Sequence, residues 1–150
     1  MHKGGNKVVN ENARQVMQAC TKGSLEGAMP FPEVVARLMD VGCEQYHTDF
    51  RRQEKTYYMP DGETHVEPLP LASQPIGQDL DPDEIVAALR AIQAQQINYV
   101  QFLDRIIVAG CVGYFVYVTG KRAMYLGRNG DFHVELFPAP AAVAADRRSL

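Results

Sequence analysis

The sequence predicts an α+β domain built from two copies of one unit, in which two helices precede a three-stranded antiparallel meander. Three observations support this prediction: a gapless internal repeat, apolar helical stripes that end at glycine, and tight turns between short alternating segments. At 150 residues the chain fits a single domain, and a hydrophobic content of 46% is sufficient for a packed core.

An internal repeat in the sequence is the strongest evidence for the predicted fold. Residues 37–67 align without a gap on residues 105–135, each position 68 residues before its counterpart. Average composition would give roughly two identities over such a length. Nine pairs are identical, namely Arg37/Arg105, Gly42/Gly110, Cys43/Cys111, Tyr46/Tyr114, Tyr57/Tyr125, Gly62/Gly130, His65/His133, Val66/Val134 and Glu67/Glu135.

A single unit of this kind, about 60 residues long, is marginal in stability. We therefore expect the two copies to share one core about a pseudo-twofold axis, within one domain that spans residues 1–150. The expected divisions are repeat one at about 10–67, a Pro-rich linker at 68–80, repeat two at about 81–137 and a flexible tail at 138–150.

In each copy one helix should end at a glycine, which adopts the left-handed conformation after a helix without strain. Apolar residues at helical spacing precede Gly42 and Gly110. The earlier stripe comprises Phe31, Val34, Val35, Leu38 and Met39, and the later one Tyr99, Phe102, Leu103, Ile106 and Ile107. A further helix should precede each of these, capped by Asn10 in the first copy and by Asp81 in the second.

Three short strands should follow each glycine. Residues 43–50 alternate between polar and apolar as a half-buried strand does, and the sequences Pro60-Asp61-Gly62 and Asn129-Gly130 are typical of hairpin turns. The third strand of each copy should turn its central valine toward the helices. The predicted core comprises Phe31, Val34, Leu38, Val66, Phe102, Leu103, Ile106 and Val134.

Both copies share a series of motifs: a helix that ends at glycine, a tyrosine four residues later, a second tyrosine, an Asp/Asn-Gly turn and a Val-Glu strand. The residues are Gly42, Tyr46, Tyr57, Asp61, Gly62, Val66 and Glu67, and again Gly110, Tyr114, Tyr125, Asn129, Gly130, Val134 and Glu135. This set resembles the YdfO-like family of small bacterial and prophage-borne proteins, loosely labelled phage envelope proteins. The resemblance covers roughly residues 31–137. It implies the fold and a prophage context, and the family has no established catalytic residues to transfer.

The repeated sequence His-Val-Glu is the sharpest candidate for chemistry. Residues two apart on a strand share a face, so each His and Glu should point together, away from the valine and away from the helices. The candidate polar or metal-binding face comprises His47, Asp49, His65, Glu67, His133 and Glu135. Imidazole and carboxylate are ligands for zinc or manganese. The alternative interpretation is an ordinary solvated sheet face, and we expect no metal, no cofactor and no catalytic residue.

Two further groups allow a functional and a structural interpretation. Cys43 and Cys111 occupy equivalent places and are either a redox pair or buried small hydrophobes. The first hairpin turns are basic and either contact a phosphate backbone or protect the sheet edge. Their residues are Arg51, Arg52, Lys55, Lys121 and Arg122. A net charge of −3 argues against a dedicated nucleic-acid binder.

The first strand of the second copy is apolar on both sides, and such a strand is normally covered on both faces. The cover would be the first copy, the tail from Pro138 onward, or a second molecule. We expect a homodimer or a partner site centred on Phe115, Tyr117 and Phe137.

These patterns favour a non-enzymatic cytoplasmic protein that acts through protein contacts and has no membrane or nucleic-acid partner. The three cysteines lack Cys-x-x-Cys spacing and fit a reducing compartment, and the longest apolar run, residues 106–118, is too short to cross a bilayer. The alternative is a metal-dependent or small-ligand-binding enzyme centred on the His/Glu face.

Overall fold

The structure, a computed structural model, describes residues 9–72 and 74–138. Over these residues it contains four helices and six strands, so the predicted α+β class and the order of elements are confirmed. The helices are α1 (Glu11–Leu25), α2 (Phe31–Asp40), α3 (Pro82–Gln93) and α4 (Tyr99–Val108). The strands are β1 (Gln45–Asp49), β2 (Glu54–Tyr58), β3 (Thr64–Pro68), β4 (Cys111–Tyr117), β5 (Arg122–Gly127) and β6 (Phe132–Leu136). The tail predicted at 138–150 lies, apart from Pro138, outside the described residues.

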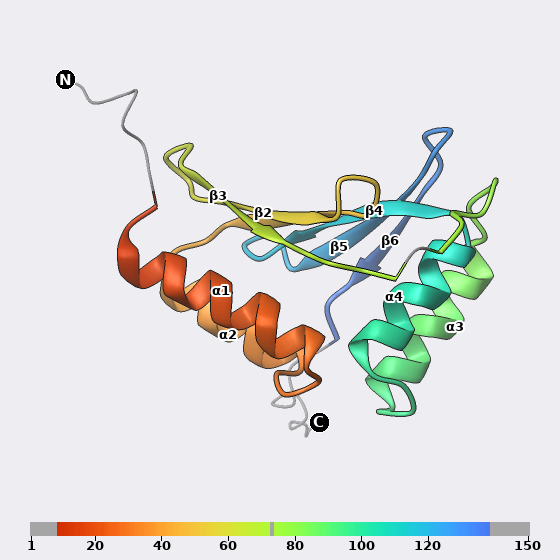
Figure 1. Ribbon diagram of the computed structural model, residues 1–150, viewed down its shortest axis with the longest axis horizontal. Helices are drawn as coiled ribbons and strands as arrows, with labels where there is room; N and C mark the ends of the chain where they lie inside the picture. Colours follow the sequence, from red (N-terminus) through yellow and green to blue (C-terminus); the bar gives the residue numbers. More distant parts are fainter. Residues whose placement is uncertain (1–8, 73, 139–150) are drawn as a thin grey trace.

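All six strands form one antiparallel sheet in the order β3-β2-β1-β4-β5-β6. The two meanders meet at its centre, where β1 pairs with β4 and Thr48 lies opposite Tyr114. The helices cover one face of the sheet, with α1 and α2 beneath one half and α3 and α4 beneath the other (Figure 1). The opposite face carries none of the described helices (Figure 1). The sheet therefore has a helix side and an open side.

The helix ends follow the local sequence. Asn10 caps α1 by accepting a hydrogen bond from the amide of Ala13 at 2.9 Å, and Asn98 forms a capping box at the start of α4. Gly42 and Gly110 directly follow the C-caps of α2 and α4 with φ of 81° and 95°. The predicted glycine stops are confirmed, because these conformations carry little strain without a Cβ.

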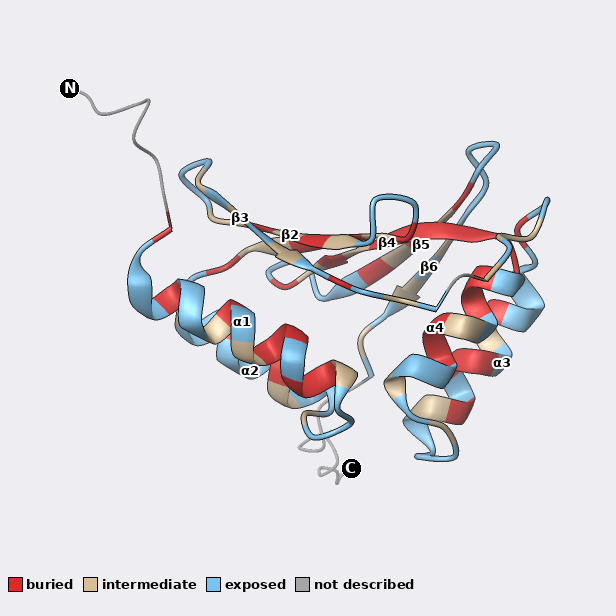
Figure 2. Ribbon diagram, viewed as in Figure 1, coloured by how far each residue is buried: buried red, intermediate tan, exposed pale blue. Residues whose placement is uncertain are grey.

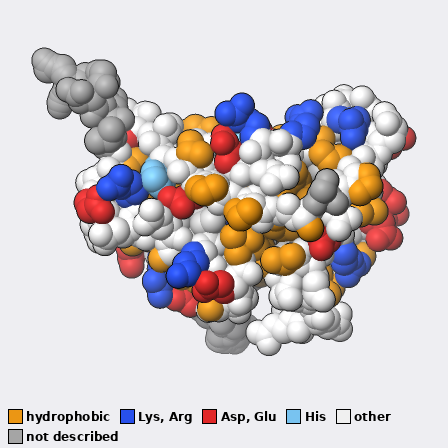
Figure 3. Space-filling view, viewed as in Figure 1, with side chains coloured by type: hydrophobic (Ala, Val, Ile, Leu, Met, Phe, Trp, Pro, Cys, Tyr) orange, Lys and Arg blue, Asp and Glu red, His pale blue; other side chains and the backbone are white. Residues whose placement is uncertain are grey.

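The linker between β3 and α3 is packed against the rest of the protein (Figure 1). Leu69 is fully buried, and the amide of Gly77 donates to the carbonyl of Ile107 at 3.0 Å. A Cβ at Gly110 would lie 2.2 Å from the carbonyl oxygen of Asp79, so this glycine serves both the helix end and the linker. On the face of the molecule seen in Figure 3, apolar side chains gather near the middle, where the linker crosses in Figure 1.

The core lies between the central strands and the inner faces of the helices (Figure 2). Of the eight predicted core residues, five are buried, and their burial confirms the helical stripes: Val34, Leu38, Phe102, Leu103 and Ile106. The other three are partly exposed, at 39% for Phe31, 46% for Val66 and 37% for Val134, so these predictions were wrong.

The predicted burial of the two valines was wrong because both lie in edge strands of the sheet. His65 is opposite the buried Tyr57 in the β2–β3 register and shares its helix side, so Val66 is left on the open side. Val134 has the same placement on β6. The helix side of an edge strand faces the polar flank of a helix, where a polar residue can keep its hydrogen bonds. The apolar residue of the alternating pair therefore gives no information about which side the helices cover.

We expect Leu103→Ala and Ile106→Ala each to lower the free energy of unfolding by about 2–5 kcal/mol, because removing a buried side chain loses its transfer free energy and leaves a cavity. Both residues have an exposed fraction of 0%. Urea unfolding is the measurement. Val108→Ala, on the same helix but 58% exposed, is the matched control and should change the value by less than about 0.5 kcal/mol. A loss below about 1 kcal/mol for either buried residue would contradict the assigned helix face.

Candidate functional site

The predicted His/Glu face is divided between the two sides of the sheet. The two residues of β1 point to the open side, whereas the four residues of β3 and β6 point to the helix side. The prediction of one polar face was therefore wrong, since β3 and β6 also form opposite edges of the sheet. The residues are His47 and Asp49 on the open side, and His65, Glu67, His133 and Glu135 on the helix side.

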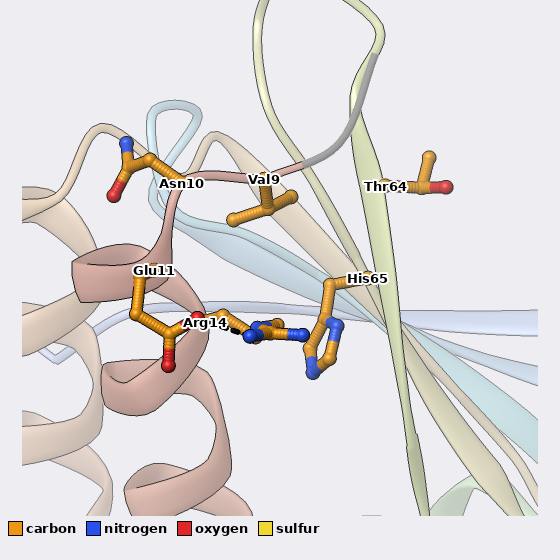
Figure 4. Close-up of a pocket in the computed structure, with 6 residues that line it drawn as sticks. All are labelled: Val9, Asn10, Glu11, Arg14, Thr64 and His65. Atoms are coloured by element: carbon orange, nitrogen blue, oxygen red, sulfur yellow. Dashed lines mark hydrogen bonds and ion pairs between the residues drawn. The ribbon is translucent and has the colours of Figure 1, made fainter. Parts of the chain in front are cut away.

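Beside β3, a hollow of about 430 Å³ is lined by residues from the start of α1 and by His65 (Figure 4). Nε2 of His65 lies 2.5 Å from a carboxylate oxygen of Glu67. The Arg14 guanidinium is paired with the Glu11 carboxylate and extends from it toward the His65 ring (Figure 4). The hollow thus has a polar wall whose groups already have partners.

Beside β6, the equivalent pair engages a helix. Arg90 of α3 donates to Glu135 at 2.8 Å, and His133 Nε2 lies 3.6 Å from the same carboxylate. Burial raises the pKa of Glu135, but the hydrogen bond and charge of Arg90 hold it below the usual value. The pair is therefore a contact between an edge strand and its covering helix. In residues 9–72 and 74–138, no group of three His, Cys, Asp or Glu side chains is placed to hold a metal ion.

The cysteines are buried thiols. Cys43 and Cys111 each donate to the carbonyl two residues on, at 3.4 and 3.2 Å. Burial raises the pKa of the Cys43 thiol to about 11 and that of Cys111 to about 12, so both stay protonated near neutral pH. A protonated thiol is a poor nucleophile, which favours the structural interpretation.

Lys55 was predicted in a basic turn and lies instead in β2, where its exposed fraction is 2%. This prediction was wrong because β2 begins one residue before Lys55, and strand alternation then places Lys55 on the same side as Tyr57. The flanking Arg51 and Arg52 are exposed in the turn, as predicted.

Two tyrosine rings lie against the buried amine. Its Nζ lies 4.8 Å from the ring centre of Tyr99 on α4 and 5.2 Å from that of Tyr46 on β1. Within the described chain it makes no ion pair and no hydrogen bond. Glu67, its neighbour across the β2–β3 pair, binds His65 instead. Burial lowers the pKa of the Lys55 ammonium to about 7, because the charged form loses its hydration.

Buried hydroxyl groups lie on the same side of the sheet as this amine. The hydroxyls of Tyr99 and Tyr114 are 2.6 Å apart. Thr48, directly opposite Lys55 in the β1–β2 register, has a buried hydroxyl with no hydrogen-bond partner of good geometry in the described chain. Burial raises the pKa of Tyr114 to about 12, against a smaller lowering effect of Thr48 beside it. Thr48 Oγ1 and, beside β6, His133 Nε2 are the buried side-chain polar atoms that lack a hydrogen-bond partner in residues 9–72 and 74–138. The sequence signal for the burial of the amine was the two-residue spacing between Lys55 and Tyr57, which places both side chains on one side of a strand.

The open side of the sheet carries a contiguous apolar surface over β4, β5 and β6. Cross-strand neighbours form rows, one of which joins Phe115, Met124 and Val134. Leu136 is 61% and Phe132 57% exposed. We name the outer apolar patch by its six residues, Phe115, Met124, Leu126, Phe132, Val134 and Leu136.

Two of the three predicted interface residues belong to the open side and one does not. The ring of Phe115 stacks on His47 at 4.3 Å between centres and on Tyr117 at 5.8 Å. Phe137 packs edge-to-face on Phe31 at 5.2 Å and joins the core on the helix side. The placement of Phe137 was therefore wrong, for the same reason as the valines: the side assigned to β6 was inverted.

No family model matches the chain, and no curated protein matches it. Among the helices that the structure describes, none is both long and apolar enough to span a bilayer. What this chain does is therefore inferred from its own residues.

We expect the stability of the protein to rise with pH between about 7 and 8.5. The pKa of Lys55 is about 7 in the folded protein and about 10.4 in the unfolded chain, so the unfolded state binds more protons in this window. The free energy of unfolding should increase by about 1 kcal/mol per pH unit, whereas below pH 7 the penalty for burying the ammonium is complete.

The measurement is urea unfolding of wild type and Lys55→Met at several pH values. The variant should be more stable at pH 7 and should lack the slope. Above about pH 8.5 the buried thiols, whose pKa values are raised, oppose the trend, because unfolding then releases their protons. An identical pH slope in wild type and variant would contradict the assignment to Lys55.

Proposed function

We propose that this protein acts through protein–protein contact and that a second copy of the chain binds its outer apolar patch. The observation that carries the proposal is the one-sided helix layer, which leaves Phe132, Val134 and Leu136 in contact with solvent (Figure 1). Contiguous apolar surface of this kind is typical of an interaction site.

The composition of the patch favours a second copy as the occupant. A twofold interface brings one surface against itself, so that surface must be self-complementary. Arg122 is the one charged residue that the described strands β4, β5 and β6 turn to the open side. Two such faces can pack as stacked sheets without opposing like charges at their centres.

We also propose that the chain arose by internal duplication and that it is a cytoplasmic protein of prophage context. The repeated residues and the repeated order of elements support an internal duplication about a pseudo-twofold axis, with the two halves sharing one core. The resemblance to the YdfO-like family supports a prophage context, and the cysteine usage supports a cytoplasmic location. The enzyme alternative on the His/Glu face has lost its geometric support, because that face is divided.

We expect wild-type protein to sediment as a dimer at tens of micromolar and Val134→Glu/Leu136→Glu to sediment as a monomer, because two carboxylates per subunit would be buried without partners. Sedimentation velocity over a concentration series is the measurement.

Val100→Glu is the matched control. Val100 lies in the first turn of α4 and is 37% exposed, the same fraction as Val134, and should leave the dimer intact. Wild type that stays monomeric at high micromolar concentration, or a double variant that still dimerises, would overturn the proposal.

A further inference from the structure

We propose that the outer edge of β6 pairs with the same edge of a second copy of the chain, in an antiparallel ladder centred on Val134 that joins the two sheets into one. β6 is the last strand of the sheet and has β5 as its only neighbouring strand in the described chain. The edge contact uses backbone groups, whereas the face-to-face association proposed above uses side chains on the open side. The two interfaces are therefore separate, and neither needs the other.

Three residues of β6 direct their backbone groups away from the sheet. The amide of Phe137 donates to the carbonyl of Lys121 at 3.0 Å. The carbonyl of Asp131 accepts from the amide of Gly127 at 2.8 Å. Because hydrogen-bonded residues alternate along an antiparallel pair, the odd-numbered positions of β6 face β5 and the others face outward, namely Phe132, Val134 and Leu136. Outward amides and carbonyls at a sheet edge are a template for a further strand.

The opposite edge of the sheet, β3, lacks one of these donors. The amide of Leu69 donates to the carbonyl of Gln53 at 2.8 Å, so by the same alternation Pro68 faces outward. Proline has no N–H, and proteins use it to keep edge strands from pairing. The residue that follows Pro68 by the repeat offset is Leu136, which has an N–H. The backbone therefore favours pairing at β6 over pairing at β3.

The side chains of the two edges differ in the same sense, although both carry the sequence His-Val-Glu. On β3, Nε2 of His65 lies 2.5 Å from a carboxylate oxygen of Glu67. On β6, Nε2 of His133 lies 3.6 Å from the Glu135 carboxylate and has no hydrogen-bond partner in residues 9–72 and 74–138. Arg90 holds Glu135 instead, at 2.8 Å. The imidazole of β6 is thus the one with a hydrogen-bonding position to fill.

The strand is self-complementary about Val134. A twofold ladder centred there places His133 opposite Glu135 of the second copy on the helix side, a basic group beside an acidic one. On the open side it places Phe132 opposite Leu136 of the second copy, which pairs an aromatic with an aliphatic side chain. Moving the centre by one residue would set His133 opposite His133, or Glu135 opposite Glu135, and lose both pairings. The register is therefore fixed by the sequence of the strand.

Edge pairing leaves the open side accessible. Antiparallel neighbours in one sheet turn opposed residues to the same face, so the outer apolar patches of the two copies lie side by side across the new ladder. Each patch can still pack against another sheet. Because β6 has only 5 residues, the edge contact is small, and we expect it to form above the concentration at which the faces associate.

Disulfide cross-linking of the whole chain under mild oxidation tests the register. Opposed residues of a hydrogen-bonded antiparallel pair have Cα atoms about 5.5 Å apart, a distance that a disulfide spans. Val134→Cys should therefore cross-link with itself, and Phe132→Cys should cross-link with Leu136→Cys when the two variants are mixed. Phe132→Cys alone should not, because its counterpart lies about 14 Å away along the ladder. The native cysteines are buried and do not compete.

Leu136→Pro separates the edge contact from the face contact, because it removes the outward N–H and keeps an apolar side chain. In the Val134→Cys protein it should slow cross-linking at least about tenfold, since each copy loses a hydrogen bond. Leu136→Ala, which keeps the N–H, is the matched control and should slow it less than about threefold. The strand should accept the change, since Pro68 occupies the equivalent place in β3.

Two results would overturn the edge proposal: equal slowing by Leu136→Pro and Leu136→Ala, or Phe132→Cys that cross-links with itself as fast as with Leu136→Cys. The second result needs no proline, so it decides the matter even if Leu136→Pro fails to fold. Either result leaves the face-to-face dimer to be judged by sedimentation of the wild-type protein. Conversely, cross-linking in the predicted register by a chain whose faces do not associate would support the edge contact alone.

Discussion

The backbone ladder between β1 and β4 holds the two meanders together in a single sheet. Each meander has three strands and a helix pair, which is too little to bury a core of its own. The β1–β4 ladder joins the meanders into one sheet and places Thr48 opposite Tyr114 and Tyr46 opposite Val116. It also brings α1 and α4 together beneath the centre of the sheet. The central strands are therefore fully buried only when the two halves are joined.

The two sides of the sheet differ because one layer of helices covers a six-stranded sheet. On the helix side, buried tyrosines from β1, β2, β4 and β5 fill the centre. The rings of Tyr46 and Tyr99 lie against the Lys55 amine. On the open side, β1 presents Gln45, His47 and Asp49 to solvent, whereas β4, β5 and β6 present the outer apolar patch. The polar open side of the first half can therefore remain in contact with water. The apolar open side of the second half is stabilised when another surface covers it.

Much of the fold could be predicted because its signals are local. Gly42 and Gly110 end helices through their own φ angles, and the apolar stripes before them need only a helical period. The side that an edge strand turns to the helices depends instead on the register with its neighbour, which the alternation of Val66 with histidine does not contain. Lys55 was missed because its charge suggested a turn, although its spacing from Tyr57 placed it inside the sheet. The candidate site was therefore less predictable than the fold, since it depends on contacts between distant segments.

Native-state hydrogen exchange tests the central role of the β1–β4 ladder most directly. If this ladder makes the two halves one cooperative unit, the amides that β1 and β4 donate to each other exchange through global unfolding, and both strands report the same free energy of opening. We expect β2 and β5, next to these strands, to share that value. A lower free energy of opening for β1 and β2 than for β4 and β5 would show that the first half opens on its own, and would contradict the account.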